Sequence, residues 1–288
     1  MAVIKISGLK KSYGKKEVLN IPDLQIRTNS ISAFIGKNGA GKTTLMRILC
    51  GLQTPTEGSV QIEPQMSALI ETPALYKEMN AKENMMQQFR IRGIKEEGKA
   101  EELLQLVGLE NTGFKRVKNF SLGMKQKLAI AMTLVGNPKL IILDEPINGL
   151  DPQGINDLRD LIVKLNKEQN ITFFISSHIL DEMAKFCTDY IFIDEGRIIH
   201  IMTDEELKNQ CEKYLHITVS NMEAFTKAAE ENNWKYEVTG QDTAKLFEEV
   251  VITDFVNELS KYECRLMKCS NEEISLEDFY LNLVGGKA

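Results

Sequence analysis

The 288-residue sequence contains no apolar run that approaches the roughly 18 residues of a membrane-spanning helix. Its first residues, 1–5, lack the long apolar core of a secretory signal peptide. Five cysteines are scattered along the chain, and no pair has the close spacing of a zinc site. We therefore expect a soluble protein with free thiols in a reducing cytosol, which could reach a membrane only through a partner.

The chain also lacks an excess of basic charge. Its formal net charge is −6 at pH 7. Residues 1–210 carry 27 Lys and Arg against 26 Asp and Glu, whereas residues 211–288 carry 8 against 15. An acidic C-terminal section argues against nucleic-acid binding there, and the first section shows no basic face. The length is comfortable for two domains, and 43% hydrophobic residues allow a sizeable core.

A glycine-rich turn between an apolar run and a helical pattern is the most specific motif. Its residues are Gly36, Lys37, Asn38, Gly39, Ala40, Gly41, Lys42, Thr43 and Thr44. Strand, glycine-rich turn and helix form the context of a phosphate-binding P-loop, whose backbone N–H groups converge on an anion. Lys42 would reach the β- and γ-phosphates, and the Thr43 hydroxyl would hold Mg²⁺. Chance would produce the fixed positions only at about the one per cent level, so the motif predicts nucleoside triphosphate binding.

A second strand ends in two acids. The apolar run Leu140–Leu143 leads directly into Asp144 and Glu145. Such a strand is buried on both faces, as in a parallel sheet, and α/β sheets place their ligands at the carboxyl ends of their strands. We predict that Asp144 binds Mg²⁺ through water and that Glu145 polarises the attacking water as general base. An apolar strand with two acids is common by itself, but downstream of a P-loop it indicates a site.

Three further features are ambiguous on their residues alone. Tyr13 could stack on an adenine ring, although a half-buried strand aromatic is the more ordinary interpretation. Ser121 can cap the helix that follows it and, with Gly123, leave backbone N–H groups available to a second anion; a simple capped helix explains the same residues. His178 follows the buried strand Ile171–Ile175 and could donate a hydrogen bond near the γ-phosphate, although a lone histidine is more often structural.

Taken in order, these motifs resemble the nucleotide-binding subunit of ABC transporters over about residues 1–210. The resemblance implies that Tyr13 stacks on adenine and that Gly36–Thr44 is the Walker A motif. It implies that Leu140–Glu145 is the Walker B motif, with Glu145 as the catalytic base. ATP and Mg²⁺ are the cofactors that follow from this assignment.

The same resemblance assigns the remaining motifs. Phe120–Met124 stands where the ABC signature lies, Gly149-Leu150-Asp151 is the D-loop, and His178 is the switch histidine. The family works as a head-to-tail dimer, so Ser121 and Gly123 would face ATP held by the partner cassette. The implied catalytic residues are Lys42, Glu145 and His178, and the nucleotide-binding residues include Tyr13, the Walker A residues, Ser121, Gly123, Met124 and Asp151.

Two positions depart from the family pattern. The signature usually reads Leu-Ser-Gly-Gly-Gln, whereas here it reads Phe-Ser-Leu-Gly-Met at residues 120–124. Glu71 stands where the family usually has a Mg²⁺-coordinating Gln; a carboxylate is an excellent Mg²⁺ ligand but adds negative charge beside the triphosphate. The implied metal ligands are therefore Thr43, Glu71 and Asp144. The stretches 68–74 and 120–126 look like the subgroup that serves lantibiotic self-immunity and bacitracin resistance.

The expected fold is α/β: a P-loop NTPase core of ABC type in residues 1–210, with a mostly parallel sheet, an antiparallel β subdomain and a helical insertion at about 72–120. In residues 211–288 we predict strands at 214–220, 235–239, 245–252 and 264–268, with helices at 222–232, 254–261 and 275–283. The order β-α-β-β-α-β would make a small ferredoxin-like α+β domain. No site is visible there, so a dimerisation or stabilising role is preferred and a regulatory role is a hypothesis.

These features predict an ATP-hydrolysing subunit of a bacterial exporter that expels membrane-active peptides through separate membrane permease subunits. The subunit would lie in the cytoplasm, against the inner face of the membrane. One alternative is a soluble ABC ATPase in translation, repair or cluster assembly, against which the single cassette and the lack of a long coiled coil argue. Another is a binding module with degenerate catalysis, against which the presence of Asp144, Glu145 and His178 argues.

Overall fold

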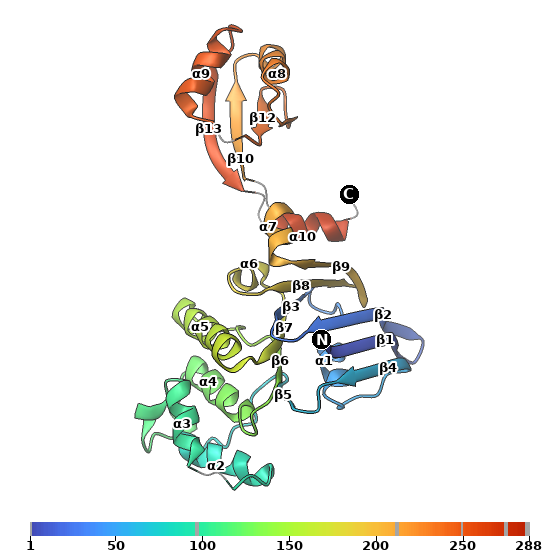
Figure 1. The fold of residues 1–288 in the computed structure, drawn as a ribbon, viewed down its shortest axis with the longest axis vertical. Helices are drawn as coiled ribbons and strands as arrows, with labels where there is room; N and C mark the ends of the chain where they lie inside the picture. Colours follow the sequence, from blue (N-terminus) through green and yellow to red (C-terminus); the bar gives the residue numbers. More distant parts are fainter. Residues whose placement is uncertain (1, 96–97, 211–212, 249, 274–275, 286–288) are drawn as a thin grey trace. The chain divides into compact units, whose positions relative to one another are not determined.

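The computed structural model describes residues 2–95, 98–210, 213–248, 250–273 and 276–285 (Figure 1). Cys211 and residues 96–97, 249 and 275, which fall in predicted elements, lie outside the described residues. The chain divides into two compact units, Met1–Asp204 and Glu205–Ala288. This division precedes the boundary predicted after residue 210, because most of helix α7, Asp204–Gln210, groups with the second unit.

A six-stranded sheet forms the centre of the first unit. Its strands, in spatial order, are β5 (Met66–Leu69), β6 (Leu140–Asp144), β7 (Thr172–Ser177), β3 (Ile31–Ile35), β8 (Asp189–Asp194) and β9 (Arg197–Thr203). Neighbouring strands are parallel except for the β8–β9 hairpin. Strands β3, β6 and β7 are buried along their whole length, as their largely apolar sequences predict. The predicted mostly parallel sheet is confirmed.

An antiparallel sheet in the order β2-β1-β4 accompanies it, built from β1 (Ala2–Tyr13), β2 (Lys16–Arg27) and β4 (Glu57–Ile62). The sequence pattern predicts short strands at 2–7, 12–14 and 18–21, and this is wrong in extent, because β1 and β2 each run for 12 residues. The polar residues Lys10 and Lys11 continue the ladder opposite Asn20 and Leu19. Backbone pairing does not depend on side-chain polarity, so polar residues can continue the two strands. The register of β1 against β2 shifts at the points where the pairing is irregular.

The two sheets enclose one hydrophobic core. Phe34, Ile142 and Phe174 point from the central sheet into a cluster that includes Leu45 and Met46 of α1 (Lys42–Leu49) and buried residues of β1 and β2. Side chains alternate across a strand, so the intervening residues of β6 and β7 face the opposite side. There α5 (Pro152–Gln169) packs against β7 (Figure 1).

The helical insertion follows β5. It contains α2 (Ala81–Ile91), α3 (Lys99–Leu106) and the short 3₁₀ turns η1 (Glu110–Thr112) and η2 (Val117–Asn119), and α4 (Leu122–Thr133) follows it. Helix α2 begins with a capping box, in which the Asn80 side chain and the Glu83 side chain each accept the other's backbone N–H. A short helix, α6 (Leu180–Met183), follows β7.

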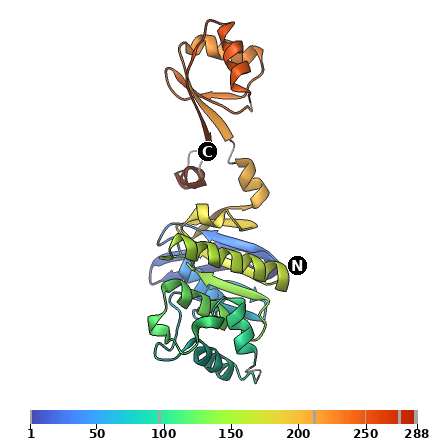
Figure 2. The ribbon, with the colours of Figure 1, turned by 90° about the vertical axis from the view of Figure 1, so that its left-hand side faces the viewer.

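The second unit contains a four-stranded antiparallel sheet in the order β11-β12-β10-β13. The strands are β10 (Lys213–Val219), β11 (Tyr236–Val238), β12 (Thr243–Leu246) and β13 (Leu266–Glu273), and the helices are α7, α8 (Met222–Glu231), α9 (Ile252–Ser260) and α10 (Leu276–Gly285). Helices α8 and α9 lie on the same side of this sheet (Figure 2). The order β-α-β-β-α-β with this strand arrangement is that of a ferredoxin-like unit.

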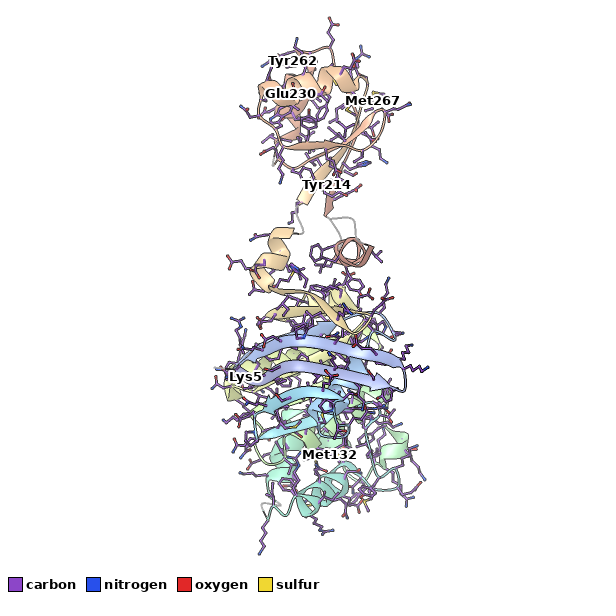
Figure 3. The ribbon with its side chains drawn as sticks, turned by 90° about the vertical axis from the view of Figure 1, so that its right-hand side faces the viewer. Lys5, Met132, Tyr214, Glu230, Tyr262 and Met267 are labelled. Atoms are coloured by element: carbon purple, nitrogen blue, oxygen red, sulfur yellow. The ribbon has the colours of Figure 1, made fainter. Side chains whose placement is uncertain are left out.

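The second unit has a core of its own. Leu215 and Ile217 of β10 face Phe225 of α8 and Phe255 of α9, all within one buried cluster. Tyr214 belongs to the opposite face of β10, and Met267 of β13 is 67% exposed (Figure 3). Because it buries a hydrophobic cluster of its own, this unit meets the condition for folding as a domain.

Candidate active site

Three strand ends meet at one edge of the central sheet. Strand β7 lies between β6 and β3, with Asp144 opposite Ser176 and Ile35 opposite Ser177. The segments that begin at Gly36, Asp144 and Ser176 therefore leave the sheet side by side. Parallel strands bring their carboxyl ends to the same edge, which is where α/β sheets bind ligands.

The glycine-rich loop after β3 is tightly packed against the neighbouring strand. A Cβ on Gly36 would lie 2.5 Å from the carbonyl oxygen of Ile193, so no larger residue fits there without movement. The Gly196 N–H donates to the Ala40 oxygen at 3.0 Å, and the Asn20 N–H donates to the Gly196 oxygen at 2.8 Å. These contacts join the loop to the β8–β9 hairpin and to β2.

The start of α1 offers free backbone donors to an anion. Gly41 occupies its N-cap position with φ of 105°, in the left-handed region that glycine tolerates, and no side chain caps the helix. The first N–H groups of a helix have no partner within the helix, and the helix dipole makes this end positive. The sequence Gly36–Thr44 therefore folds into the anion cradle that a triphosphate requires.

Lys42 is the buried cation of this cradle, at 5% exposure. Its Nζ donates to the Gly36 oxygen at 2.7 Å and to the Lys37 oxygen at 3.2 Å, and lies 3.2 Å from Glu145 Oε1. A buried ammonium needs such partners because it has lost its water. The three oxygens thus hold Lys42 where phosphate oxygens would compete for it.

Glu145 links this cation to the histidine. Its second carboxylate oxygen lies 2.8 Å from Nδ1 of His178, so Lys42, Glu145 and His178 form one continuous chain of polar contacts. The backbone of Glu145 has φ of 50°, an uncommon left-handed conformation, and its N–H donates to the Ser176 hydroxyl at 2.9 Å. The turn after β6 is therefore held so that Asp144 and Glu145 point in different directions.

Asp144 is 5% exposed and accepts a hydrogen bond of 2.5 Å from the Ser176 hydroxyl. Its carboxylate and the Thr43 hydroxyl are hard oxygen donors of the kind that Mg²⁺ prefers. Among the residues that the structure describes, no group of three or more His, Cys, Asp and Glu side chains could hold a metal ion.

Burial also affects a thiol beside this acid. Cys50, at the C-cap of α1, has its pKa raised to about 11 by desolvation, with a further contribution from the negative charge of Asp144. The thiol is therefore protonated at neutral pH and is a poor nucleophile.

The carboxylate of Glu71 is paired with another side chain. It follows β5, the neighbour of β6, and its carboxylate forms an ion pair with the guanidinium of Arg47 on α1. Its backbone is left-handed, with φ of 59°.

Tyr13 ends β1 and is 48% exposed, with its hydroxyl donating to Gln53 Oε1 at 2.7 Å. Lys11 Nζ lies 5.1 Å from the centre of the ring. The ring is thus oriented by its hydroxyl while much of its surface remains open, the state that a stacking platform requires.

The signature and D-loop residues form a second group. Ser121 is the N-cap of α4 and accepts the Met124 N–H at 3.2 Å, which confirms the predicted cap. Asp151 caps α5 in the same way, through the Gly154 N–H at 2.9 Å. A Cβ on Gly149 would lie 3.2 Å from the Leu122 side chain, so the two helix starts are packed together within one chain.

Ser176, Arg47 and Gln53 contact site residues but were not among the predicted ones. A hydroxyl at a strand end, directly across from an acid on the adjacent strand, is a signal that could have identified Ser176. The partners of Arg47 and Gln53 are distant in sequence, and no local pattern marks them.

The sequence is similar to those of known proteins. A family model described as ABC transporter matches residues 19–148. The bacitracin transport ATP-binding protein BcrA of Bacillus licheniformis is 36% identical, with 99% of this chain and 98% of that protein covered. The lantibiotic transport ATP-binding protein SrtF of Streptococcus pyogenes is 45% identical over 68% of this chain and 89% of its own length.

Solved structures of ABC transporter proteins are also similar to this chain. The chain superimposes on cbiO1 of Clostridium perfringens, part of an ABC transporter complex, with a TM-score of 0.66 and 26% identity over 73% of this chain and 91% of that one. A dimeric post-hydrolysis state of the ATP-binding cassette MJ0796, bound to ADP and Pi, matches with a TM-score of 0.62 and 25% identity, over 69% of this chain and 98% of that one. With its P-loop, paired acids and histidine assembled at one sheet edge, the chain belongs to the ABC transporter family, as an ATP-binding cassette ATPase.

Proposed function

We propose that this protein powers a bacterial exporter that expels a membrane-active peptide antibiotic of the bacitracin or lantibiotic type. The observation that carries this proposal is the extent of the similarity to BcrA of Bacillus licheniformis, which covers 99% of this chain. It therefore extends beyond the cassette into residues 205–288, where the demands of ATP hydrolysis alone would not impose similarity. The lantibiotic transport protein SrtF supports the same class of cargo.

The site residues act on ATP in this proposal. The adenine stacks on Tyr13, and the phosphates bind to the N–H groups of residues 36–44. Lys42 exchanges its contacts with the Gly36 and Lys37 oxygens for phosphate oxygens. This exchange also removes Lys42 from Glu145 Oε1, 3.2 Å away, which leaves that carboxylate oxygen available to accept a proton from water.

Mg²⁺ would be held by the Thr43 hydroxyl and by Asp144 through water, with Glu71 as a third oxygen donor. Bound there, the ion supplies positive charge against the developing negative charge of the phosphates. His178 orients the carboxylate of Glu145 by donating its Nδ1–H. A hydrogen bond to the transferred phosphoryl group would come from Nε2–H, which the ring carries together with Nδ1–H only as an imidazolium.

A second cassette would complete each site. In this proposal two copies associate head to tail, and Ser121, Gly123, Met124 and Asp151 act on the nucleotide of the partner. The dimeric, ADP-bound state of the similar cassette MJ0796 supports such an arrangement. The capping of both helix starts by Ser121 and Asp151 would hold these residues in place.

Separate membrane permease subunits would carry the peptide. No helix among the described residues is long and apolar enough to cross a membrane. We propose that the cassette docks from the cytoplasm onto permeases at the inner face of the membrane, through the helical insertion near residues 72–95.

The partners can be identified with a Glu145→Gln variant, which should retain ATP and hold its complex together. A tagged copy would be purified with ATP from detergent-solubilised membranes, and its partners identified by mass spectrometry. We expect a polytopic membrane protein, and we expect it to be lost when Lys42→Ala is added to the same chain. A purely soluble set of partners would instead favour an ABC ATPase in translation, repair or cluster assembly.

The cargo can be tested by expressing the protein with those partners in a peptide-sensitive Gram-positive host. The minimal inhibitory concentrations of bacitracin and of a lantibiotic are expected to rise for the wild type but not for Lys42→Ala. Unchanged sensitivity to both peptides, with the membrane complex intact, would contradict the peptide-export assignment.

A further inference from the structure

The ion pair between Arg47 and Glu71 joins the P-loop helix to the turn after β5. Arg47 stands in the last turn of α1, and its guanidinium meets the Glu71 carboxylate while both side chains remain partly exposed, at 39% and 52%. The Glu71 backbone holds a left-handed φ of 59°, which is uncommon for a residue with a side chain. The turn therefore presents this carboxylate toward α1 in a defined direction.

The pair lies one helical turn from the proposed metal position. Thr43 and Arg47 are four residues apart on α1, so their side chains are neighbours on the same helix face. One turn of an α-helix advances about 5.4 Å. Glu71 also follows β5, which pairs with β6 up to Leu69 opposite Leu143, directly before Asp144. The partner of Glu71 is thus one helical turn from Thr43, and the strand that precedes Glu71 runs beside the strand that ends at Asp144.

The negative charge of Glu71 affects the binding of a triphosphate at this position. A carboxylate beside a triphosphate adds repulsion, whereas a carboxylate paired with a guanidinium contributes almost no net charge. Arg47 is favourably placed whether or not Glu71 remains with it, because a cation near a helix C-terminus interacts well with the helix dipole. Partly exposed ion pairs are weak, so the pair can open readily when a stronger partner for the carboxylate arrives.

We propose that Arg47 is a positioning residue that holds Glu71 away from the metal site and releases it when Mg²⁺ and nucleotide are bound. Arg47 and Mg²⁺ then compete for one carboxylate, so the arginine raises the Mg²⁺ concentration that the nucleotide-bound protein requires. The inference rests on the proposed metal role of Thr43, Asp144 and Glu71.

The test is a double-mutant cycle on the full chain: wild type, Arg47→Met, Glu71→Gln and the double variant. Binding of a fluorescent non-hydrolysable ATP analogue is followed during Mg²⁺ titration, which gives the half-saturating Mg²⁺ concentration without relying on hydrolysis. In Arg47→Met this concentration is expected to fall by about threefold, the scale of a surface ion pair. In the Glu71→Gln background, adding Arg47→Met should leave it unchanged.

Arg159→Met provides a matched control, because Arg159 is paired only with the adjacent Asp160 among the ion pairs described and lies on α5. It should not change the Mg²⁺ requirement. Arg47→Lys keeps the charge and helix propensity if Arg47→Met proves unstable, and its half-saturating concentration should lie at or near the wild-type value. An unchanged value in Arg47→Met, or the same shift in both backgrounds, would overturn the proposal for Arg47. If Mg²⁺ strengthens analogue binding in none of the four proteins, the proposed metal site itself is wrong.

Discussion

At the scale of single residues, Lys42 and Glu145 form an ion pair at the centre of the candidate site. The ammonium is almost fully buried and is surrounded by oxygens of Gly36, Lys37 and Glu145. His178 contacts the far side of the same carboxylate. In the proposed mechanism, nucleotide binding exchanges the partners of Lys42, and phosphate oxygens replace these internal oxygens.

Glu145→Gln is expected to reduce ATP turnover by about 100- to 10,000-fold, the usual contribution of a general base. An amide cannot accept the proton of the attacking water, but it keeps the size of the side chain and leaves Thr43 and Asp144 in place. Steady-state hydrolysis and equilibrium binding of a fluorescent ATP analogue should show lost turnover with retained affinity. Normal turnover would show that another group is the base.

Gly36→Ala is expected to lower the free energy of unfolding by about 1–3 kcal/mol, the range for overpacking a filled site. The new methyl group would stand 2.5 Å from the Ile193 oxygen. Gly98→Ala is the matched control, because no heavy atom lies within 4 Å of its Cβ position and its φ is not positive. Urea denaturation of both variants measures the difference, and equal stabilities would contradict the packing argument.

The sequence pattern predicts that Asp144, Glu145 and His178 lie close to one another. Each follows an apolar strand, and parallel strands end at a common edge, so their proximity follows from the pattern. The partner of Glu71 could not be predicted in this way. Its contact with Arg47 depends on the rotation of α1 about its axis and on the left-handed backbone at Glu71, neither of which leaves a periodic signal.

At the scale of elements, the N-termini of α4 and α5 contribute to stability and, in the proposed dimer, to the nucleotide site. Helices α4 and α5 are capped by Ser121 and Asp151, and they meet where Gly149 allows the Leu122 side chain close to its backbone. Each cap satisfies a donor that would otherwise be without a partner. The same geometry fixes the surface that the proposed partner cassette would contact.

Ser121→Ala is expected to lower the free energy of unfolding by about 1 kcal/mol, because the Met124 N–H loses its acceptor. Ser121→Asp keeps a strong cap and should restore the stability, while its negative charge repels the phosphates of the partner's nucleotide. Denaturation and hydrolysis measured together separate the two effects. If Ser121→Asp hydrolyses ATP like the wild type, this residue does not face a nucleotide in the assembly.

Element bounds were hardest to predict where local preference and tertiary contacts disagree. Residues 245–252 are rich in strand-forming types and predict one strand, which is wrong, because β12 ends at Leu246 and α9 begins at Ile252. Alternating burial stops after Leu246, and Val251 instead occupies the N-cap position of α9. The central strands β3, β6 and β7 show no such conflict, since they are largely apolar and buried along their whole length.

At the scale of the whole molecule, the two compact units have separate hydrophobic cores. The proposed nucleotide and metal residues, from Tyr13 to His178, all belong to the first unit, 1–204. The second unit buries Phe225 and Phe255 in its own cluster. Stability can therefore be lost in one unit while the other remains folded.

Phe225→Ala is expected to destabilise the second unit by about 3–5 kcal/mol, the range for removing a fully buried phenyl group. Calorimetry should show one transition moved to lower temperature and the other unchanged. Analogue binding at a temperature between the two transitions should be retained, since no proposed site residue lies in the second unit. Joint movement of both transitions would show that the units fold cooperatively.

The hydrogen bonds that run from Asn20 through Gly196 to Ala40 have a consequence for how fast and how tightly nucleotide is captured. They tie the phosphate loop to the strand scaffold through the protein's own backbone, so the loop loses its freedom during folding rather than during binding. The entropy penalty of association is then confined to a few side chains. Capture in such a preorganised cradle would be limited by diffusion and by the exchange at Lys42, not by the ordering of a loop.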